Sequence, residues 1–99
     1  MTDRELLELA AKAAGDGIVF YGECWRAQSG REWNPLLDDG DALRLAVKLN
    51  LWLHVEEYGA SARRAGGAWL GCEAHLHGGI EVATRRAIVR AAAAIGKEM

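Results

Sequence analysis

Residues 33–53 read Trp-Asn-Pro-Leu-Leu-Asp-Asp-Gly-Asp-Ala-Leu-Arg-Leu-Ala-Val-Lys-Leu-Asn-Leu-Trp-Leu, and this stretch decides the fold. Asn34-Pro35 predicts a turn, because the residue before a proline is disfavoured in the α region and proline has no N–H to donate. Three aspartates follow just ahead of an apolar run, and their carboxylates can accept the free N–H groups of a first helical turn. Asp39 or Asp41 is therefore the expected N-cap. The same acidic run lacks the further oxygen ligands and the distal glutamate of a calcium loop.

The helix that follows this start is almost entirely apolar. Between residues 42 and 49 only Arg44 and Lys48 are charged, so the apolar arc is wide, as expected for a helix covered on most sides. Asn50 is the expected helix stop. Residues 51–56 then alternate between apolar and polar or aromatic side chains, which predicts a strand. One face of this strand should carry Leu51, Leu53 and Val55, and the other should carry Trp52, His54 and Glu56.

Length and composition predict a single domain over residues 1–99. Half of the residues are apolar, which argues against disorder, and the formal net charge of −2 gives no basic excess for nucleic acid. No apolar run is long enough to span a bilayer, and no export signal is recognisable at Met1, so a cytoplasmic location and no membrane partner are expected. Cys24 and Cys72 are accordingly expected to be reduced, buried thiols.

Local signals predict the remaining elements. Thr2 and Glu5 form a capping box at the start of a helix that Gly15 ends. Glycines and small polar residues separate the later segments, and alternation or helical periodicity assigns each one. The other expected elements are a strand over 17–25 with a bulge at Gly22, a short return strand over 31–33, a polar connection over 57–67, a strand over 68–77, and a helix over 80–95 that Gly96 caps.

These elements give the order α-β-β-α-β-β-α. The strands over 51–56 and 68–77 are expected to form an antiparallel hairpin, with the connection over 57–67 as a mobile loop. An α+β class follows, in which a mostly antiparallel sheet packs between or against helices, as in an α/β/α sandwich.

Two segments carry a family resemblance. Residues 34–49, Asn-Pro-Leu-Leu-Asp-Asp-Gly-Asp-Ala-Leu-Arg-Leu-Ala-Val-Lys-Leu, and the arginine-bearing residues 83–91, Ala-Thr-Arg-Arg-Ala-Ile-Val-Arg-Ala, resemble small phage and prophage proteins of the phage ABA-sandwich domain family. The motifs are helix caps and apolar periodicity, and residues 58–78 match least. The resemblance implies a sheet between helices and a phage origin, and it implies no activity.

Three histidines suggest one candidate metal site. Residues i and i+2 of a strand point to the same face, so His75 and His77 could share a divalent ion with His54 from the neighbouring strand. Cys72 falls on the opposite face of that strand and has no place in this ligand set. The alternative, favoured because the ligand set is incomplete, is a half-exposed strand face whose imidazoles rest on Trp52 and Trp69.

The same alternation along the two strands predicts a candidate binding surface on one face of the sheet. Tryptophans with scattered polar neighbours are typical of protein interfaces. A helix that covers this face and buries the rings is the slightly favoured alternative, because a small domain needs the apolar area. The expected surface consists of Trp52, His54, Trp69, Glu73 and His75.

No nucleophile elbow, phosphate loop or pair of catalytic carboxylates is present in the sequence. Arg63, Arg64 and the arginines of residues 85–90 could form a basic patch, but with a negative net charge nucleic acid is not an expected partner. The resemblance implies a phage or prophage accessory protein. The absence of a catalytic motif and the tryptophan-rich strand face favour a protein that binds a host or phage protein or itself, without a cofactor, over an enzyme. The alternative is a metal-binding protein or metal-dependent hydrolase that uses His54, His75 and His77.

Overall fold

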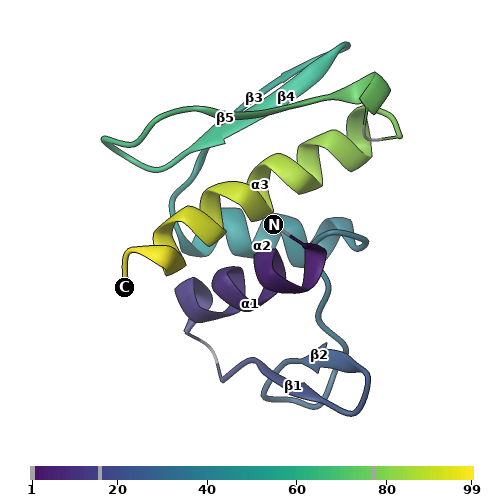
Figure 1. Cartoon of the computed structure of the whole chain (residues 1–99), viewed down its shortest axis with the longest axis vertical. Coiled ribbons are helices and arrows are strands. Elements are labelled where there is room, and N and C mark those ends of the chain that lie inside the picture. Colours follow the sequence, from purple (N-terminus) through teal and green to yellow (C-terminus); the bar gives the residue numbers. More distant parts are fainter. Residues whose placement is uncertain (1, 16, 77) are drawn as a thin grey trace.

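The computed structural model describes residues 2–15, 17–76 and 78–99 of the chain. In this part of the chain, three α-helices and two antiparallel sheets follow in the order α-β-β-α-β-β-β-α (Figure 1). The predicted α+β class is confirmed. The elements are α1 (Asp3–Ala14), β1 (Val19–Tyr21), β2 (Cys24–Arg26), α2 (Asp39–Lys48), β3 (Trp52–Glu56), β4 (Gly59–Arg63), β5 (Leu70–Glu73), the short 3₁₀ helix η1 (Ala74–Leu76) and α3 (Ile80–Lys97).

The layers follow one another from one end of the molecule to the other. The three-stranded sheet, in the order β3-β4-β5, forms one end, α3 lies against it, and the β1–β2 hairpin forms the opposite end beyond α1 (Figure 1). All three helices lie on one side of the three-stranded sheet. The sheet therefore packs against the helices and not between them, and its other face is open.

Helix α3 is the element around which the others pack. Ala83, Ala87 and Ala91 face the sheet, where they meet Ala60 and Ala62 of β4. A second stripe of α3, which includes Val89 and Ala92, packs against α1 and α2. Small side chains on both sides bring the sheet close to the helix. The prediction that α2 is the helix covered on most sides is wrong, because α3 has that position.

The two ends of α1 are set by local signals, as predicted. The Thr2 hydroxyl accepts a hydrogen bond from the Glu5 N–H at 3.2 Å, and the Glu5 carboxylate accepts one from the Thr2 N–H at 3.3 Å. These bonds lower the pKa of Glu5, first through the Thr2 backbone and then through its hydroxyl. Gly15 ends the helix in the left-handed conformation, with φ 66°.

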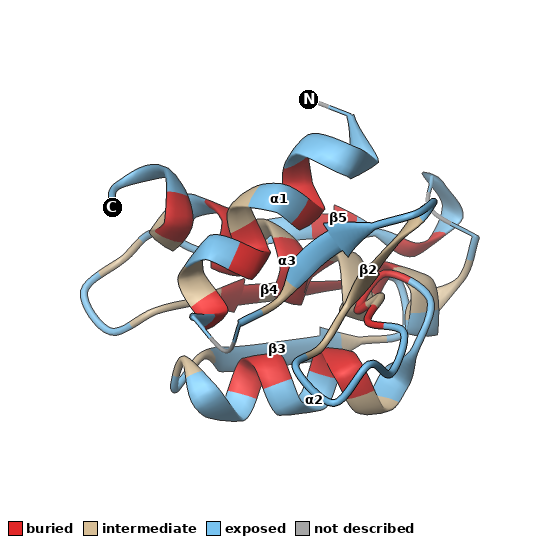
Figure 2. Cartoon of the chain, turned by 90° about the horizontal axis from the view of Figure 1, so that it is seen from below, coloured by how far each residue is buried: buried red, intermediate tan, exposed pale blue. Residues whose placement is uncertain are grey.

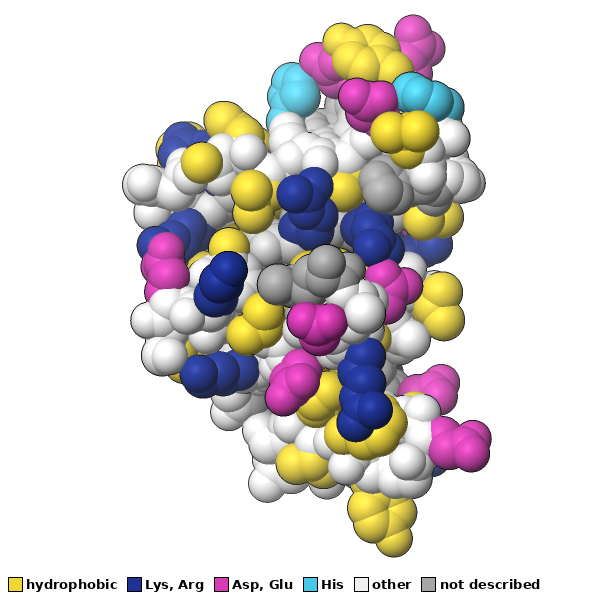
Figure 3. All heavy atoms as spheres, in the orientation of Figure 1, with side chains coloured by type: hydrophobic (Ala, Val, Ile, Leu, Met, Phe, Trp, Pro, Cys, Tyr) yellow, Lys and Arg dark blue, Asp and Glu magenta, His cyan; other side chains and the backbone are white. Residues whose placement is uncertain are grey.

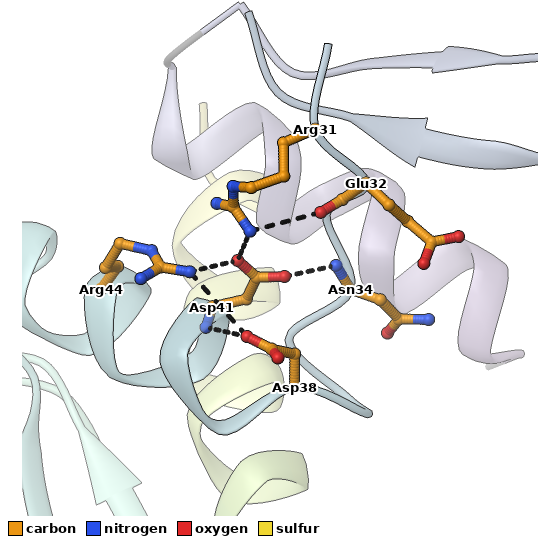
Figure 4. Close-up of polar contacts among 6 residues, drawn as sticks. All are labelled: Arg31, Glu32, Asn34, Asp38, Asp41 and Arg44. Atoms are coloured by element: carbon orange, nitrogen blue, oxygen red, sulfur yellow. Dashed lines mark hydrogen bonds and ion pairs between the residues drawn. The ribbon is translucent and has the colours of Figure 1, made fainter. Parts of the chain in front are cut away.

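The predicted N-cap of α2 is wrong by one residue or more. Asp38 is the N-cap, and its carboxylate accepts a hydrogen bond from the Asp41 N–H at 2.8 Å. The Asp41 carboxylate is only 2% exposed and turns away from the helix end (Figure 4). It accepts hydrogen bonds from Arg44 at 2.7 Å, from Arg31 at 2.9 Å and from the Asn34 N–H at 2.9 Å. Asp41 thereby ties the segment before α2 to the helix.

Two sequence predictions in the second half of the chain are wrong. The segment expected as a mobile loop over 57–67 contains β4, which is the middle strand of the sheet. Strand β4 pairs with β3 through Leu53↔Ala62 and with β5 through Ala60↔Cys72, so β3 and β5 do not form the expected hairpin. The prediction fails because Gly, Ala and Ser have low strand propensity, whereas the close approach of β4 to α3 requires small side chains.

Three other expected strands also differ from the structure. The strand expected over 17–25 is a hairpin, in which Gly22 lies in the turn with φ 71° and is not a bulge. The return strand expected over 31–33 is reduced to a bridge between Arg26 and Glu32. The strand expected over 68–77 ends at Glu73.

Helix α3 continues through Gly96 to Lys97, so Gly96 is not the predicted cap. A Cβ atom at Gly96 would overlap the Leu9 carbonyl oxygen of α1. The glycine therefore serves the close packing of α1 on α3. Within the described residues, no helix is long and apolar enough to cross a membrane.

Candidate functional site

The open face of the three-stranded sheet carries the candidate site. Alternation along β3 sends Trp52, His54 and Glu56 to this face, while Leu53 and Val55 turn toward the helices. Ser61 and Arg63 of β4 lie opposite His54 and Trp52 on the same face. Figure 3 shows histidine, acidic and hydrophobic side chains gathered at the end of the molecule that this sheet forms.

Two tryptophans flank an arginine at one end of this face. The Arg63 guanidinium carbon lies 4.0 Å from the Trp52 ring centroid and 5.2 Å from that of Trp69, which lies in the loop before β5. At these distances the cation is attracted to both rings. Trp52 is 54% exposed and Trp69 is 48% exposed. The favoured expectation that these rings are buried is therefore wrong. Trp52, Arg63 and Trp69 are called the tryptophan cluster below.

The guanidinium of Arg63 is held in place by its surroundings. Its Nη1 donates a long hydrogen bond of 3.5 Å to the Gly67 carbonyl oxygen. Its Nε is buried and has no hydrogen-bond partner. The unpaired N–H costs free energy, and the attraction of the guanidinium to the two rings offsets that cost. The tryptophan cluster is thus a preformed aromatic and cationic surface.

Histidines and carboxylates border the tryptophan cluster. The His54 Nε2 lies 2.7 Å from a Glu56 carboxylate oxygen, and the His54 ring meets Trp69 edge-on with centroids 6.4 Å apart. Hydrogen bonds from the Tyr58 hydroxyl and then from His54 lower the pKa of Glu56, and the same contact with Glu56 raises the pKa of Tyr58. This border is acidic and hydrogen-bonding.

All five residues of the predicted binding surface lie on or beside the open face. His54, Glu73 and His75 line one shallow depression, and the His54–Trp69 contact joins it to the tryptophan cluster. Arg63 is the residue of this face that the sequence does not predict, because residues 57–67 are expected to form a loop. The signal that could have found it is the alternation of buried Ala60 and Ala62 with Ser61 and Arg63.

His75 does not lie in the strand that the metal-site prediction requires. His75 lies in η1 and not in a strand, so the i, i+2 argument that joined it to His77 does not apply. His77 lies outside the described residues. Among the residues that are described, no three His, Cys, Asp or Glu side chains come together closely enough to hold one metal ion.

The cysteines offer no nucleophile at this face. Cys24 and Cys72 are both free thiols, Cys24 half-buried and Cys72 buried on the helix side of β5. Nη1 of Arg90 lies 3.7 Å from the Cys72 Sγ. That guanidinium also donates a 2.6 Å hydrogen bond to the Gly71 carbonyl oxygen, so it anchors β5 to α3.

The arginines considered as a basic patch are dispersed and engaged. Arg85 pairs with Asp39 at 2.6 Å, Arg86 pairs with Asp3 at 2.8 Å, and Arg64 pairs with Glu98. These pairs tie α3 to α2, α1 to α3, and the loop after β4 to the C-terminal end of α3. These ion pairs connect elements of the fold, and the arginines do not form a continuous phosphate-binding surface.

Comparison with known proteins adds no assignment, since no protein-family model, no curated protein and no solved structure matches the chain.

Proposed function

We propose that this chain is a protein-binding module and that its open sheet face, centred on the tryptophan cluster, is the binding surface. The observation that carries the proposal is the exposure of Trp52 and Trp69 on either side of Arg63. Tryptophan and arginine are the residues most enriched at the centres of protein interfaces. Their side chains here are already held together, so little conformational freedom remains to be lost on binding.

The border of the surface suits a protein partner better than a nucleic acid. Glu56 and Glu73 place carboxylates beside the cluster, and a phosphate backbone would be repelled there. Arg63, the arginine of the cluster, already contacts two rings. A partner that presents an apolar side chain to the rings and a donor group to the carboxylates fits both parts of the surface.

The proposed setting is that of a phage or prophage accessory protein that acts on a host or phage protein in the bacterial cytoplasm. This part of the proposal rests on the resemblance of residues 34–49 and 83–91 alone. The binding surface and the setting are separate statements, and the experiment below tests the surface whichever organism supplies the partner.

The test is affinity capture from a bacterial lysate with three forms of the protein. The wild type is compared with the Trp52→Ala/Trp69→Ala variant and with a control, Tyr21→Ala/Leu76→Ala, which removes exposed apolar side chains outside the cluster. Each capture is repeated after nuclease treatment. We expect one protein to be retained by the wild type and the control, to be lost with the tryptophan variant, and to persist after nuclease.

Two results would contradict the proposal. Equal capture of the same protein by a folded tryptophan variant would show that the cluster is not the binding surface. Loss of the captured protein after nuclease would show that a nucleic acid bridges the two, and the partner class would then be wrong.

A further inference from the structure

An apolar groove lies on the opposite side of β3 from the tryptophan cluster. It has a volume of about 320 Å³ and runs between β3, α2 and the first half of α3. Side chains exposed in or beside it, by between 40% and 68%, are Leu43 and Val47 of α2 and Leu53 and Val55 of β3. These side chains form a continuous apolar surface, which in monomeric soluble proteins commonly marks an interaction site. The groove is lined by Leu43, Leu53, Val55, Ile80, Thr84 and Ile88, among others.

Strand β3 is an edge strand without the usual protection. It pairs with β4 on one side, and no strand lies on its other side in the described sheet. Figure 2 shows β3 exposed beside α2. Monomeric proteins shield such edges with lysine, proline or inward-pointing charges. Strand β3 has the sequence Trp-Leu-His-Val-Glu, with no lysine or proline and with apolar inward residues.

We propose that a second copy of this chain docks at this edge, with the two β3 strands antiparallel about a two-fold axis at His54. A two-fold axis at a residue preserves the alternation of faces, and the axis at His54 pairs all five residues of the strand. On the groove side, Leu53 then faces Val55 of the second copy. On the open side, Trp52 faces Glu56 of the second copy. The strand is thus complementary to itself on its apolar face.

The direction of α2 suits the same axis. The two-fold axis reverses the second helix, so the N-terminal end of one α2 lies beside the C-terminal end of the other, and the opposed helix dipoles favour this orientation over the parallel one. The apolar stripe of Leu43 and Val47 lies between these ends, where it meets its counterpart.

The dimer accounts for a failed expectation about α2. Its wide apolar arc predicts a helix covered on most sides, whereas Leu43 and Val47 are exposed in the single chain. A stable interface needs about 800 Å² from each partner, which is roughly one seventh of the 5905 Å² surface of this chain. The second copy covers α2 and joins the two sheets, and it places both tryptophan clusters on one continuous face.

Sedimentation over a concentration series tests the dimer. We expect the wild type to sediment at twice the chain mass, and Val47→Glu and Val55→Lys to sediment at the chain mass, because each places a charge in the apolar contact. The control Tyr21→Glu alters an equally exposed apolar residue in the distant β1–β2 hairpin and should remain dimeric (Figure 1). A wild type that is monomeric at every concentration would overturn the proposal, and so would variants that remain dimeric.

A cysteine at the axis tests the register without depending on charge. In a Cys24→Ser background, His54→Cys should form a disulfide-linked dimer on oxidation, since residues directly opposite lie within about 5.5 Å between Cβ atoms. Glu56→Cys is the matched control, because its Cα would lie roughly 14 Å from its counterpart along the strands. Equal cross-linking of both variants, or none at residue 54, would contradict the pairing. Val47→Glu leaves the tryptophan cluster intact, so a failure of the dimer is distinguishable from a failure of partner binding.

Discussion

Asp41 is a buried carboxylate that accepts hydrogen bonds from two arginines and one backbone N–H. Burial alone would raise the pKa of this carboxyl, but the hydrogen bonds from Asn34, Arg44 and Arg31 outweigh it and lower the pKa. The segment before α2 depends on this one side chain for its attachment to the helix. Its removal would leave the Asn34 N–H without its acceptor.

Asp41→Asn should lower the free energy of unfolding by about 1–3 kcal/mol at neutral pH, the cost of leaving buried groups unsatisfied. Because the folded-state pKa lies below the unfolded value of 3.8, the carboxylate stabilises the fold fully above that value. The stabilisation is lost as the pH falls through the folded pKa. Denaturant unfolding of both proteins from pH 7 to pH 2 should therefore show a difference that shrinks below about pH 4. Asp39→Asn is the matched control, since the Asp39 side chain is 78% exposed and its charge should contribute at most about 1 kcal/mol. A difference between wild type and Asp41→Asn that stays constant with pH would contradict the account.

The tryptophans differ in what they do for stability. Trp33 is 6% exposed and packs in the core, so Trp33→Ala should cost about 3–5 kcal/mol. Trp69→Ala removes an exposed ring and a cation–π contact, which together should cost about 1 kcal/mol. Chemical denaturation of the two variants measures both numbers. Comparable losses for both would mean that Trp69 is a core residue and that the open face is wrong.

At this scale the sequence predicted which face each residue of β3 occupies but not what covers that face. Alternation is a local property, so it assigned Trp52 and His54 to one side correctly. Whether a helix lies over that side depends on the path of the whole chain. The face of Arg63 is not predictable in this way, because its strand carries no local strand signal.

At the scale of the elements, α1 and α3 pack closely because Gly96 of α3 has no side chain. Gly96→Ala should lower the free energy of unfolding by about 1–3 kcal/mol, since the added Cβ meets the rigid backbone at Leu9. Helix propensity alone would give the opposite sign, a gain of about 1 kcal/mol. Lys97→Ala, an exposed change in the same turn, should alter stability by no more than about 0.5 kcal/mol. A stabilised Gly96→Ala variant in thermal or denaturant unfolding would contradict the close approach.

Strand β4 should be among the best protected parts of the sheet. It is paired on both sides, so the amide groups of residues 60–62 should exchange with solvent far more slowly than those of the loop over 64–69. Hydrogen exchange followed by mass spectrometry or NMR measures this contrast. Exchange in β4 as fast as in that loop would contradict its position as the central strand and would support a mobile loop over these residues.

The comparison of these elements shows which sequence signals are reliable. The bounds of α1 could be predicted because both of its caps are local. The capping box joins Thr2 and Glu5, and Gly15 ends the helix through its own backbone conformation. Strand β4 owes its position to pairing with β3 and β5 and to the small residues of α3. Those contacts are distant in sequence, and the Gly-Ala-Ser-Ala composition of β4 gives no local sign of them.

For the molecule as a whole, the one-sided arrangement of helices has a direct consequence. The helix-facing side of the sheet closes the core through alanines, whereas the other side leaves large aromatic rings in solvent. A chain of 99 residues that leaves such rings outside its core forgoes apolar burial that a small domain needs. The proposed binding role explains why these rings are exposed, because a bound partner would bury them.

The most direct measurement of this central claim is the affinity of the captured partner, by calorimetric titration, for the wild type, the Trp52→Ala/Trp69→Ala variant and the Tyr21→Ala/Leu76→Ala control. The account predicts a loss of about 30-fold or more for the tryptophan variant, equivalent to about 2 kcal/mol at the centre of an interface. The control should bind as the wild type does. Unchanged affinity in a folded tryptophan variant would contradict the account.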